Sequence, residues 1–267
     1  MTSPLSLLQS PTLPLSPLTL DTSTFLTLLT LQGPSLGLWR AAEVAALREQ
    51  VYEPPVLDLG CGDGLVTSMV LKQVAIALDP NSTALQKASQ LGIYDRLIPT
   101  AVEQSQLPDA SIGTIISNSV LEHIPNIEDA LDAAARLLRP GGKLIFTVPT
   151  EAFSEWLAVP SRRYATWRNQ HLCHLNLWSA EQWTQQLERV GLRVETIRPY
   201  LTREWVSLWD GLELLQQIWV GKRRLVGLIW KRIPPSVMES MAEQASRLDL
   251  SAPAPGGGRL IVARKEN

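Results

Sequence analysis

A glycine-rich stretch that follows a short apolar run constrains this chain more than any other feature. The largely apolar run over residues 56–59 comes after two prolines and predicts a buried strand, and Gly60, Gly62 and Gly64 then occupy every second position. Glycine adopts positive φ and has no Cβ, so the chain can turn sharply here and bring bare backbone N–H groups against a ligand. The stretch therefore predicts a nucleotide-type pocket on an α/β fold.

The spacing of the glycines separates two classes of nucleotide site. A dinucleotide fingerprint, G-x-G-x-x-G, would require a third glycine at position 65, where the chain has Leu65. The observed D-L-G-C-G-D-G resembles instead motif I of the class I S-adenosylmethionine-dependent methyltransferases. That resemblance implies that Asp58 lies near the methionyl amine of the cofactor, with Gly60, Cys61 and Gly62 beside it.

Asp79 is expected to complete the cofactor site from the end of the next strand. The apolar run over residues 74–78 predicts a second buried strand, and Asp79-Pro80 follows it, 21 positions after Asp58. An acidic residue there can accept hydrogen bonds from both ribose hydroxyls of an adenosine, and Pro80 is expected beside it. Capping of the helix that begins near Asn81 is the alternative role of Asp79.

Three further segments resemble the same family. A Leu-Pro pair preceded by an acidic position implies that Glu103 and Gln104 lie at the adenine edge. Residues 111–117 predict the central fourth strand, so Asn118 is expected at the carboxyl edge of the sheet with the other cofactor contacts. The sequence R-L-L-R-P-G-G-K-L-I-F, which predicts a helix end, a tight turn and the fifth strand, is among the strongest resemblances in the chain.

The run S-V-L-E-H-I-P after Asn118 carries the candidate catalytic residues. It resembles a segment of the type 11 group, which includes the quinone-biosynthesis methyltransferases, where a similar segment faces the transferred methyl group. His123 can take the proton of a substrate hydroxyl or amine, because an imidazole titrates near neutrality. A structural histidine that holds the loop before Pro125 is the alternative. Glu122 is either a second candidate base or a cap for the helix that follows.

Substrate specificity is expected after Pro149, where eight of the nine tryptophans lie. Basic and aromatic side chains alternate in an insertion over residues 151–178 and can bind a phosphate, carboxylate or sugar, although a structural cover with solvated arginines is the alternative. The candidate substrate contacts are Arg163, Tyr164, Trp167, His171 and His174. Three potential ligands within the four residues His171-Leu172-Cys173-His174 cannot easily converge on one ion, so no metal site is predicted.

The two ends of the chain differ from the minimal family fold. Residues 1–36 predict an irregular arm rich in Pro, Leu and Ser, without the features of a secretory signal or a membrane-spanning helix. Residues 38–49 predict a helix that either covers the cofactor pocket or only packs on the sheet. A second insertion is expected over 199–256. Within it, residues 212–232 favour an amphipathic basic helix, which is a lid or a peripheral membrane contact.

Composition limits the classes of partner and the compartment. A net charge of −2 and a pI near 6.0 give no general attraction to phosphate backbones, so no nucleic-acid partner is expected. Only two cysteines are present, which argues against a disulfide framework and favours a reducing, cytoplasmic location.

The resemblance implies a class I methyltransferase domain over residues 37–267. Its fold would be a Rossmann-like seven-stranded mixed sheet of order 3-2-1-4-5-7-6, with the last strand antiparallel, helices on both faces and helical insertions after strands 5 and 6. Its cofactor would be S-adenosylmethionine and its acceptor a small molecule or a lipid. A non-catalytic cofactor-binding partner is the alternative, and a nicotinamide-dependent oxidoreductase is disfavoured by Leu65.

Overall fold

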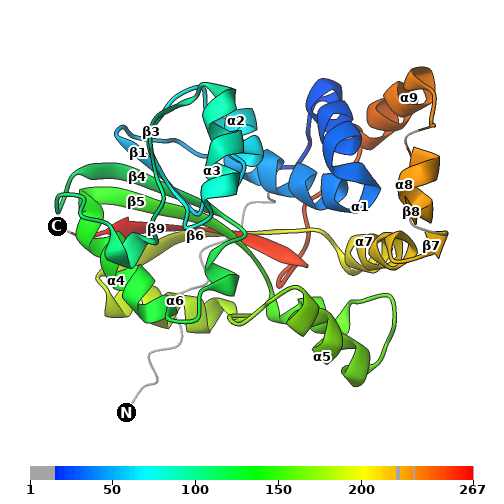
Figure 1. Ribbon diagram of the computed structural model, residues 1–267. Helices are drawn as coiled ribbons and strands as arrows, with labels where there is room; N and C mark the ends of the chain where they lie inside the picture. Colours follow the sequence, from blue (N-terminus) through cyan, green and yellow to red (C-terminus); the bar gives the residue numbers. More distant parts are fainter. Residues whose placement is uncertain (1–15, 221–222, 231, 267) are drawn as a thin grey trace, which may run out of the picture.

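A seven-stranded sheet forms the centre of the protein in the computed structural model, which describes residues 16–220, 223–230 and 232–266 (Figure 1). The strand order is β3-β2-β1-β4-β5-β9-β6. All neighbouring pairs are parallel except those of β9, which runs antiparallel to both β5 and β6. The predicted sheet is confirmed. Its strands are β1 (Val56–Leu59), β2 (Val74–Leu78), β3 (Tyr94–Ile98), β4 (Ile112–Asn118), β5 (Leu138–Pro149), β6 (Leu192–Tyr200) and β9 (Gly258–Lys265).

Helices cover both faces of the sheet, as predicted (Figure 1). Successive side chains of a strand point to opposite faces, so Ile116 and Ile145 pack in the core cluster of α1, whereas Ile115 and Leu144 pack in that of α4 and α6. The first face carries α1 (Thr22–Arg48), α2 (Leu65–Val70) and α3 (Ser82–Ala88), and the second carries α4 (Ile127–Leu137) and α6 (Ala180–Arg189). Short 3₁₀ turns complete the connections at η1 (Ser89–Leu91), η2 (Val102–Gln104), η3 (Leu121–His123) and η4 (Glu151–Glu155).

The prediction of an irregular arm over residues 1–36 is wrong from residue 22 onward, because α1 begins at Thr22. The carboxylate of Asp21 caps the helix by accepting the Thr24 N–H at 2.9 Å, and it also pairs with Arg48. The prediction was wrong because it treated the prolines of this segment as evidence against a helix. Gly33 interrupts the helical geometry with φ 79°, and Pro34 follows directly, where a new helical segment tolerates the missing N–H. Residues 1–15 lie outside the described part of the chain.

The single basic helix expected over residues 212–232 is also wrong. Helix α7 (Arg203–Gln216) ends early, and the strands β7 (Trp219–Val220) and β8 (Arg223–Arg224) pair before α8 (Leu225–Trp230) begins. Residues 218–220 are aromatic or β-branched and a glycine follows them in the sequence, a combination that favours a strand and a turn over a continuous helix. Among the described residues, no helix is long and apolar enough to cross a membrane.

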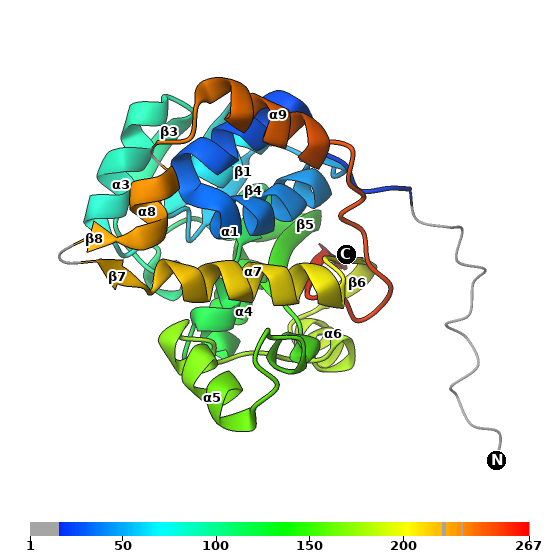
Figure 2. The same cartoon turned by 90° about the vertical axis from the view of Figure 1, so that its right-hand side faces the viewer.

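The two insertions and the N-terminal helix gather beyond the carboxyl ends of the parallel strands. Figure 2 shows α7 across the front of this end, with α1 and α9 (Pro235–Ala245) on one side of it and α5 (Arg162–His171) on the other. Helix α1 packs against both α7 and α9. The indole N–H of Trp230 donates to the Leu29 carbonyl at 2.9 Å, and the Leu250 N–H donates to the Leu18 carbonyl at 2.8 Å. The second insertion is thereby bonded to the segment from Leu18 to Leu29.

Candidate active site

The glycine loop between β1 and α2 forms the floor of the site. Gly60 has φ 72° and Gly62 has φ 56°, a left-handed region that other residues adopt only at a cost. The Gly60 N–H donates to the Leu78 carbonyl at 2.8 Å, so the loop is attached to the end of β2. A Cβ at Gly60 would lie 2.5 Å from Val120 Cγ1, whereas one at Gly62 would meet nothing within 4 Å. Gly62 therefore presents bare backbone to open space.

A cavity of about 340 Å³ opens over this loop on the side of α1. Among its walls are five of the predicted cofactor contacts that come from the loop and its neighbours: Asp58, Gly60, Cys61, Gly62 and Asn118. The Asp58 carboxylate is buried and accepts the Tyr94 hydroxyl at 2.7 Å. Burial raises the pKa of Asp58 to about 6, and the nearby Asp79 adds to this shift. A cationic amine in the cavity would find a buried partner here.

A second cavity, of about 360 Å³, lies between the ends of β1, β2 and β4. Asp79, Pro80 and Glu103 line it, and Asp79 also lines the first cavity. The two oxygens of the Asp79 carboxylate accept the N–H groups of Gly62 and Asn81, both at 2.8 Å, so this side chain is fixed at the junction. Gln104 is exposed and does not line either cavity. The residues present fit an adenosine with a charged amino-acid tail, because acidic groups lie at both ends of a bare glycine turn.

The buried carboxylate of Glu43 on α1 is a site residue that sequence reasoning missed. It accepts the Trp39 indole N–H at 2.9 Å, Arg40 Nη1 at 2.6 Å and Asn118 Nδ2 at 3.0 Å, and the Ser119 hydroxyl also donates to it. These bonds attach α1 to the carboxyl end of β4. In the sequence, Glu43 stands among alanines on an ordinary helix and carries no signal of this role.

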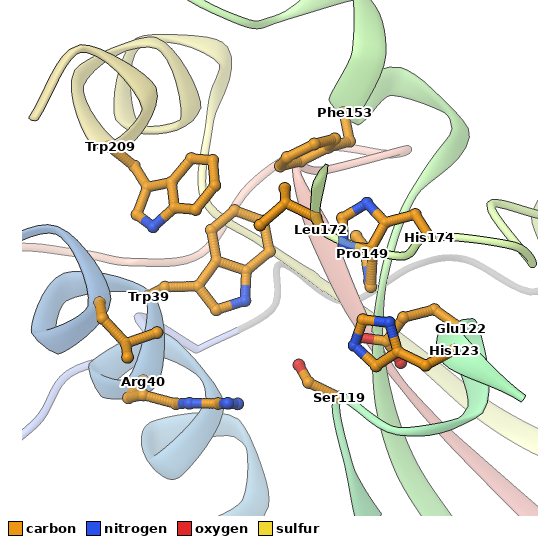
Figure 3. Close-up of a pocket in the computed structure, with 11 residues that line it drawn as sticks. Trp39, Arg40, Ser119, Glu122, His123, Pro149, Phe153, Leu172, His174 and Trp209 are labelled. Carbon is orange, nitrogen blue, oxygen red and sulfur yellow. The ribbon is translucent and has the colours of Figure 1, made fainter. Parts of the chain in front are cut away.

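A third cavity of about 180 Å³ adjoins the first two and lies toward the insertions. Figure 3 shows the residues that line it. Trp39, Phe153 and Trp209 form an aromatic group on one side of it, with ring centroids 5.2 to 5.7 Å apart. The polar side chains in its wall are Arg40, Ser119, Glu122, His123 and His174. Ser119 lines all three cavities and has a positive φ of 49°, a conformation that non-glycine residues adopt mainly where function or packing requires it.

Glu122, His123 and His174 meet at the polar end of the third cavity (Figure 3). His123 Nε2 lies 3.6 Å from Glu122 Oε1, and the rings of His123 and His174 stack with centroids 5.5 Å apart. Burial raises the pKa of Glu122 to about 8, with the charge of Glu43 contributing, and burial lowers the pKa of His174 to about 3. The sequence predicted the first two as catalytic and the third as a substrate contact, and the structure brings them together.

Backbone hydrogen bonds fix this meeting of two distant loops. The carbonyl of Glu122 accepts the N–H groups of Leu175 at 2.8 Å and Asn176 at 3.1 Å. The Asn176 amide then donates to the carbonyls of Leu121 and Ile124, each at 2.8 Å. The loop after α5 is thus held against η3, so the position of His174 relative to His123 is set by the backbone.

The other predicted substrate contacts do not line the third cavity. Arg163 is exposed, and Trp167 and His171 stack on each other at the surface of α5 with centroids 5.5 Å apart. The Tyr164 hydroxyl donates to Asp210 at 2.8 Å. That carboxylate also accepts Arg168 Nε at 3.0 Å, in a buried ion pair that joins α5 to α7. Of the basic and aromatic residues named here, Tyr164 and Arg168 therefore join α5 to α7, whereas Arg163, Trp167 and His171 lie at the surface.

Comparison with known proteins agrees with the fold. Residues 38–197 match the sequence pattern of the family described as "Methyltransferase domain". Because this match covers more than half of the chain, the protein belongs to that family and is a class I S-adenosylmethionine-dependent methyltransferase by family and fold. The match stops before most of the second insertion.

Relatives of known sequence or structure share part of the chain. An uncharacterized methyltransferase of Schizosaccharomyces pombe is 27% identical over 174 residues, which are 58% of this chain and 66% of the relative. A ubiquinone biosynthesis O-methyltransferase of Salmonella arizonae is 26% identical over 133 residues, which are 47% of this chain and 55% of the relative. The chain therefore spans less than two thirds of the length of these relatives.

Solved structures extend the comparison of the fold to most of the chain. A Thermotoga maritima methyltransferase, described as a possible histamine N-methyltransferase, superimposes with a TM-score of 0.56 at 15% identity and covers 86% of this chain and 90% of that one. At this level of identity the similarity shows the fold alone.

Proposed function

We propose that this protein methylates a hydroxyl group on an acceptor with an apolar, aromatic body, and that S-adenosylmethionine supplies the methyl group. The observation that carries the proposal is the junction at Ser119, where two cofactor-type cavities meet a third cavity with aromatic walls and a polar end. An acceptor in the third cavity and a cofactor in the other two would approach each other at this residue. When bound, the cofactor supplies an activated methyl group on a positively charged sulfur.

The residues of the two cofactor cavities bind and orient. Asp58 receives the amine, and Asp79 and Glu103 receive the ribose and adenine groups, as the resemblance implies. Trp39, Phe153 and Trp209 hold the apolar body of the acceptor and exclude water. Such alignment of two reactants is worth roughly 7 to 11 kcal/mol of the barrier in favourable cases. Most of the rate enhancement would therefore come from positioning.

Glu122 and His123 are the candidate base. The His123 Nδ1 lies 3.0 Å from the Cys173 carbonyl, which can only accept, so Nδ1 carries the proton and Nε2 is free to receive one. Nε2 also faces Glu122 Oε1 at 3.6 Å. A base so placed contributes about 10²- to 10⁴-fold. The pair therefore provides a destination for the proton of the acceptor hydroxyl.

Calorimetric titration with S-adenosylmethionine, repeated on Asp79→Ala, tests the cofactor half of the proposal. We expect micromolar binding by the wild type that is lost in the variant. Gln104→Ala is the matched control, because Gln104 does not line the cavities, and it should bind normally. No binding by the wild type would overturn the proposed function.

Transfer of a labelled methyl group to a panel of phenols, catechols and isoprenoid phenols tests the acceptor half. We expect turnover on a member of this panel and its loss in the Glu122→Gln, His123→Ala double variant, with normal cofactor affinity. Cofactor binding without turnover on any acceptor of the panel would instead support a non-catalytic binding role.

A further inference from the structure

We propose that Glu122, His123 and His174 bind a divalent transition-metal ion, and that this ion holds the acceptor oxygen during methyl transfer. The first half of the proposal concerns a site and is independent of the reaction. The second half rests on the proposed function. No metal site was expected from the sequence, because His171 and His174 do not converge and the partners of His174 lie 51 and 52 positions earlier in the chain.

The three side chains already lie near the spacing that an ion requires. Their potential ligand atoms all lie within 4.8 Å of one another, and His123 Nε2 is 3.6 Å from Glu122 Oε1. Zinc bonds to imidazole nitrogen and carboxylate oxygen are about 2.0 to 2.2 Å long, so ligand atoms at the corners of a tetrahedron lie about 3.4 Å apart. Small rotations of the half-exposed His123 ring and of His174 would reach this geometry.

Both imidazoles are oriented with their Nε2 lone pairs available. The proton on His123 Nδ1 goes to the Cys173 carbonyl, as described above. The His174 Nδ1 lies 3.2 Å from Asn169 Oδ1, an amide oxygen that can only accept, and Asn169 Nδ2 donates to Ser154 Oγ at 2.8 Å. His174 Nδ1 is therefore also the protonated nitrogen. Metal-bound histidines show this arrangement, in which the second ring N–H is held by a carbonyl or a similar acceptor.

Glu122 supplies an independent indication of a cation. Its side chain is 2% exposed, and Oε2 has no hydrogen-bond partner within the described residues. Buried carboxylate oxygens are normally paired with a donor or a metal. Arg40 lines the same cavity and its charge acts on Glu122, but its guanidinium pairs with Glu43 at 2.6 Å and donates no hydrogen bond to Glu122 Oε2. A metal ion would satisfy the orphaned oxygen.

The ligand set indicates the kind of ion. Two imidazoles and one carboxylate suit zinc and neighbouring first-row ions, whereas Mg²⁺ and Ca²⁺ prefer oxygen ligands alone. Three protein ligands leave a fourth position open, as in catalytic zinc sites, and here the open position faces the third cavity. The hydroxyl oxygen of the acceptor would occupy it.

With the ion bound, Glu122 and His123 would be its ligands and no longer the base, so the ion would take over the activation of the acceptor. A Lewis acid lowers the pKa of a bound hydroxyl, so the O–H proton leaves to water and the oxygen keeps the electron pair. That oxygen forms the new bond to the methyl carbon, while the carbon–sulfur bond breaks and its electrons go to sulfur. The products are a methyl ether, a neutral thioether and one released proton.

Titration with Co²⁺ tests the site, because four-coordinate cobalt bound to imidazole and carboxylate ligands absorbs visible light much more strongly than hydrated cobalt. We expect the chelator-treated full chain to bind one Co²⁺ and to lose the signal when Zn²⁺ is added. His174→Ala and Glu122→Gln should weaken binding at least 10-fold, and thermal melting should show that both variants are folded. Two matched variants should bind normally: His171→Ala, which removes a histidine outside the cluster, and Cys173→Ser, which removes the nearest thiol.

Equal cobalt affinity in the wild type and His174→Ala would overturn the site, as would no cobalt signal in the wild type. The experiments distinguish failure of the metal proposal from failure of the proposed function. Methyl transfer at the same rate in chelator as with added Zn²⁺ overturns the role of the ion while the proposed function stands. Metal binding in a protein that binds no S-adenosylmethionine overturns the proposed function while the metal site stands.

Discussion

The proposed cofactor half and the proposed acceptor half of the candidate site are built in different ways. The cofactor half comes from consecutive residues of one loop and from the ends of adjacent strands, so Asp58 and Asp79 are placed by the sheet itself. The acceptor half takes Trp39, Phe153 and Trp209 from three segments that meet only in the folded protein. The edge of a sheet can position a ligand that all members of a fold family share. The half of a site that differs between members depends on contacts between residues far apart in the sequence.

The largest expected effect falls on the acceptor half. Asp210→Ala removes the acidic partner that lies 3.0 Å from Arg168 Nε, and it leaves this guanidinium, whose side chain is 1% exposed, with the longer pair to Glu213 at 3.5 Å. Breaking such a pair costs about 3 to 5 kcal/mol, so we expect the free energy of unfolding in urea to fall by that amount. The control is Asp132→Ala, which breaks the exposed pair with Arg189 and should cost about 0 to 1 kcal/mol. Equal losses in the two variants would contradict the structural role of the Asp210 pair.

Glu43→Gln tests the connection between the two halves. The carboxylate accepts hydrogen bonds from Trp39, Arg40, Asn118 and Ser119, and an amide loses the charge and part of this acceptor capacity. A hydrogen bond to a charged group contributes about 1.5 to 3 kcal/mol, so we expect a loss of stability in that range. Cofactor affinity, measured by calorimetry, should fall as well. Unchanged affinity would show that α1 does not position the cofactor cavity.

Gly60→Ala examines the cofactor half alone. The left-handed φ costs an alanine about 1 to 2 kcal/mol, and the new Cβ would also clash with Val120. Gly141→Ala is the matched control, because Gly141 has φ 75° but open space where its Cβ would lie. We expect Gly141→Ala to lose stability only, and Gly60→Ala to lose stability and cofactor affinity. Recovery of affinity in the Gly60→Ala, Val120→Ala double variant would confirm the clash as the cause.

The smallest expected effect is a pH dependence of cofactor affinity. Asp58 binds a protonated amine only as a carboxylate, and its pKa is about 6. Below pH 6 the dissociation constant for S-adenosylmethionine should therefore rise about tenfold per pH unit. In the free protein the raised pKa acts in the opposite direction, because its contribution to stability is full below the usual value of 3.8 and is lost as pH rises through about 6. Asp58→Asn should flatten both profiles, and a profile unchanged by this substitution would assign them to another group.

The difference between the halves also explains what the sequence could predict. The strand positions, the glycine loop and Asp79 follow from local patterns, because periodicity and turn chemistry act over a few residues, whereas the strand order came from the family resemblance. The start of α1 was not predicted, because its segment contains a proline directly after Gly33. In the sequence, a proline that begins a new helical segment cannot be told from one that ends a helix. Tyr164 looked like a substrate contact, but the Asp210 carboxylate that accepts its hydroxyl lies 46 positions away. Partners at such distances leave no local pattern.

The break in α1 has a consequence for the timing of the reaction. Gln32 and Arg40 stand on opposite sides of Gly33, and both line the cavity over the glycine loop. This helix therefore forms one wall of that cavity on both sides of its break, and α7 and α9 of the second insertion pack against it. A spent cofactor that leaves on this side would have to displace α1 and its contacts with these two helices. We therefore expect the pace of repeated turnover to be governed by product escape through this wall, so that sequence changes in the second insertion tune the speed of the enzyme without touching either reactant.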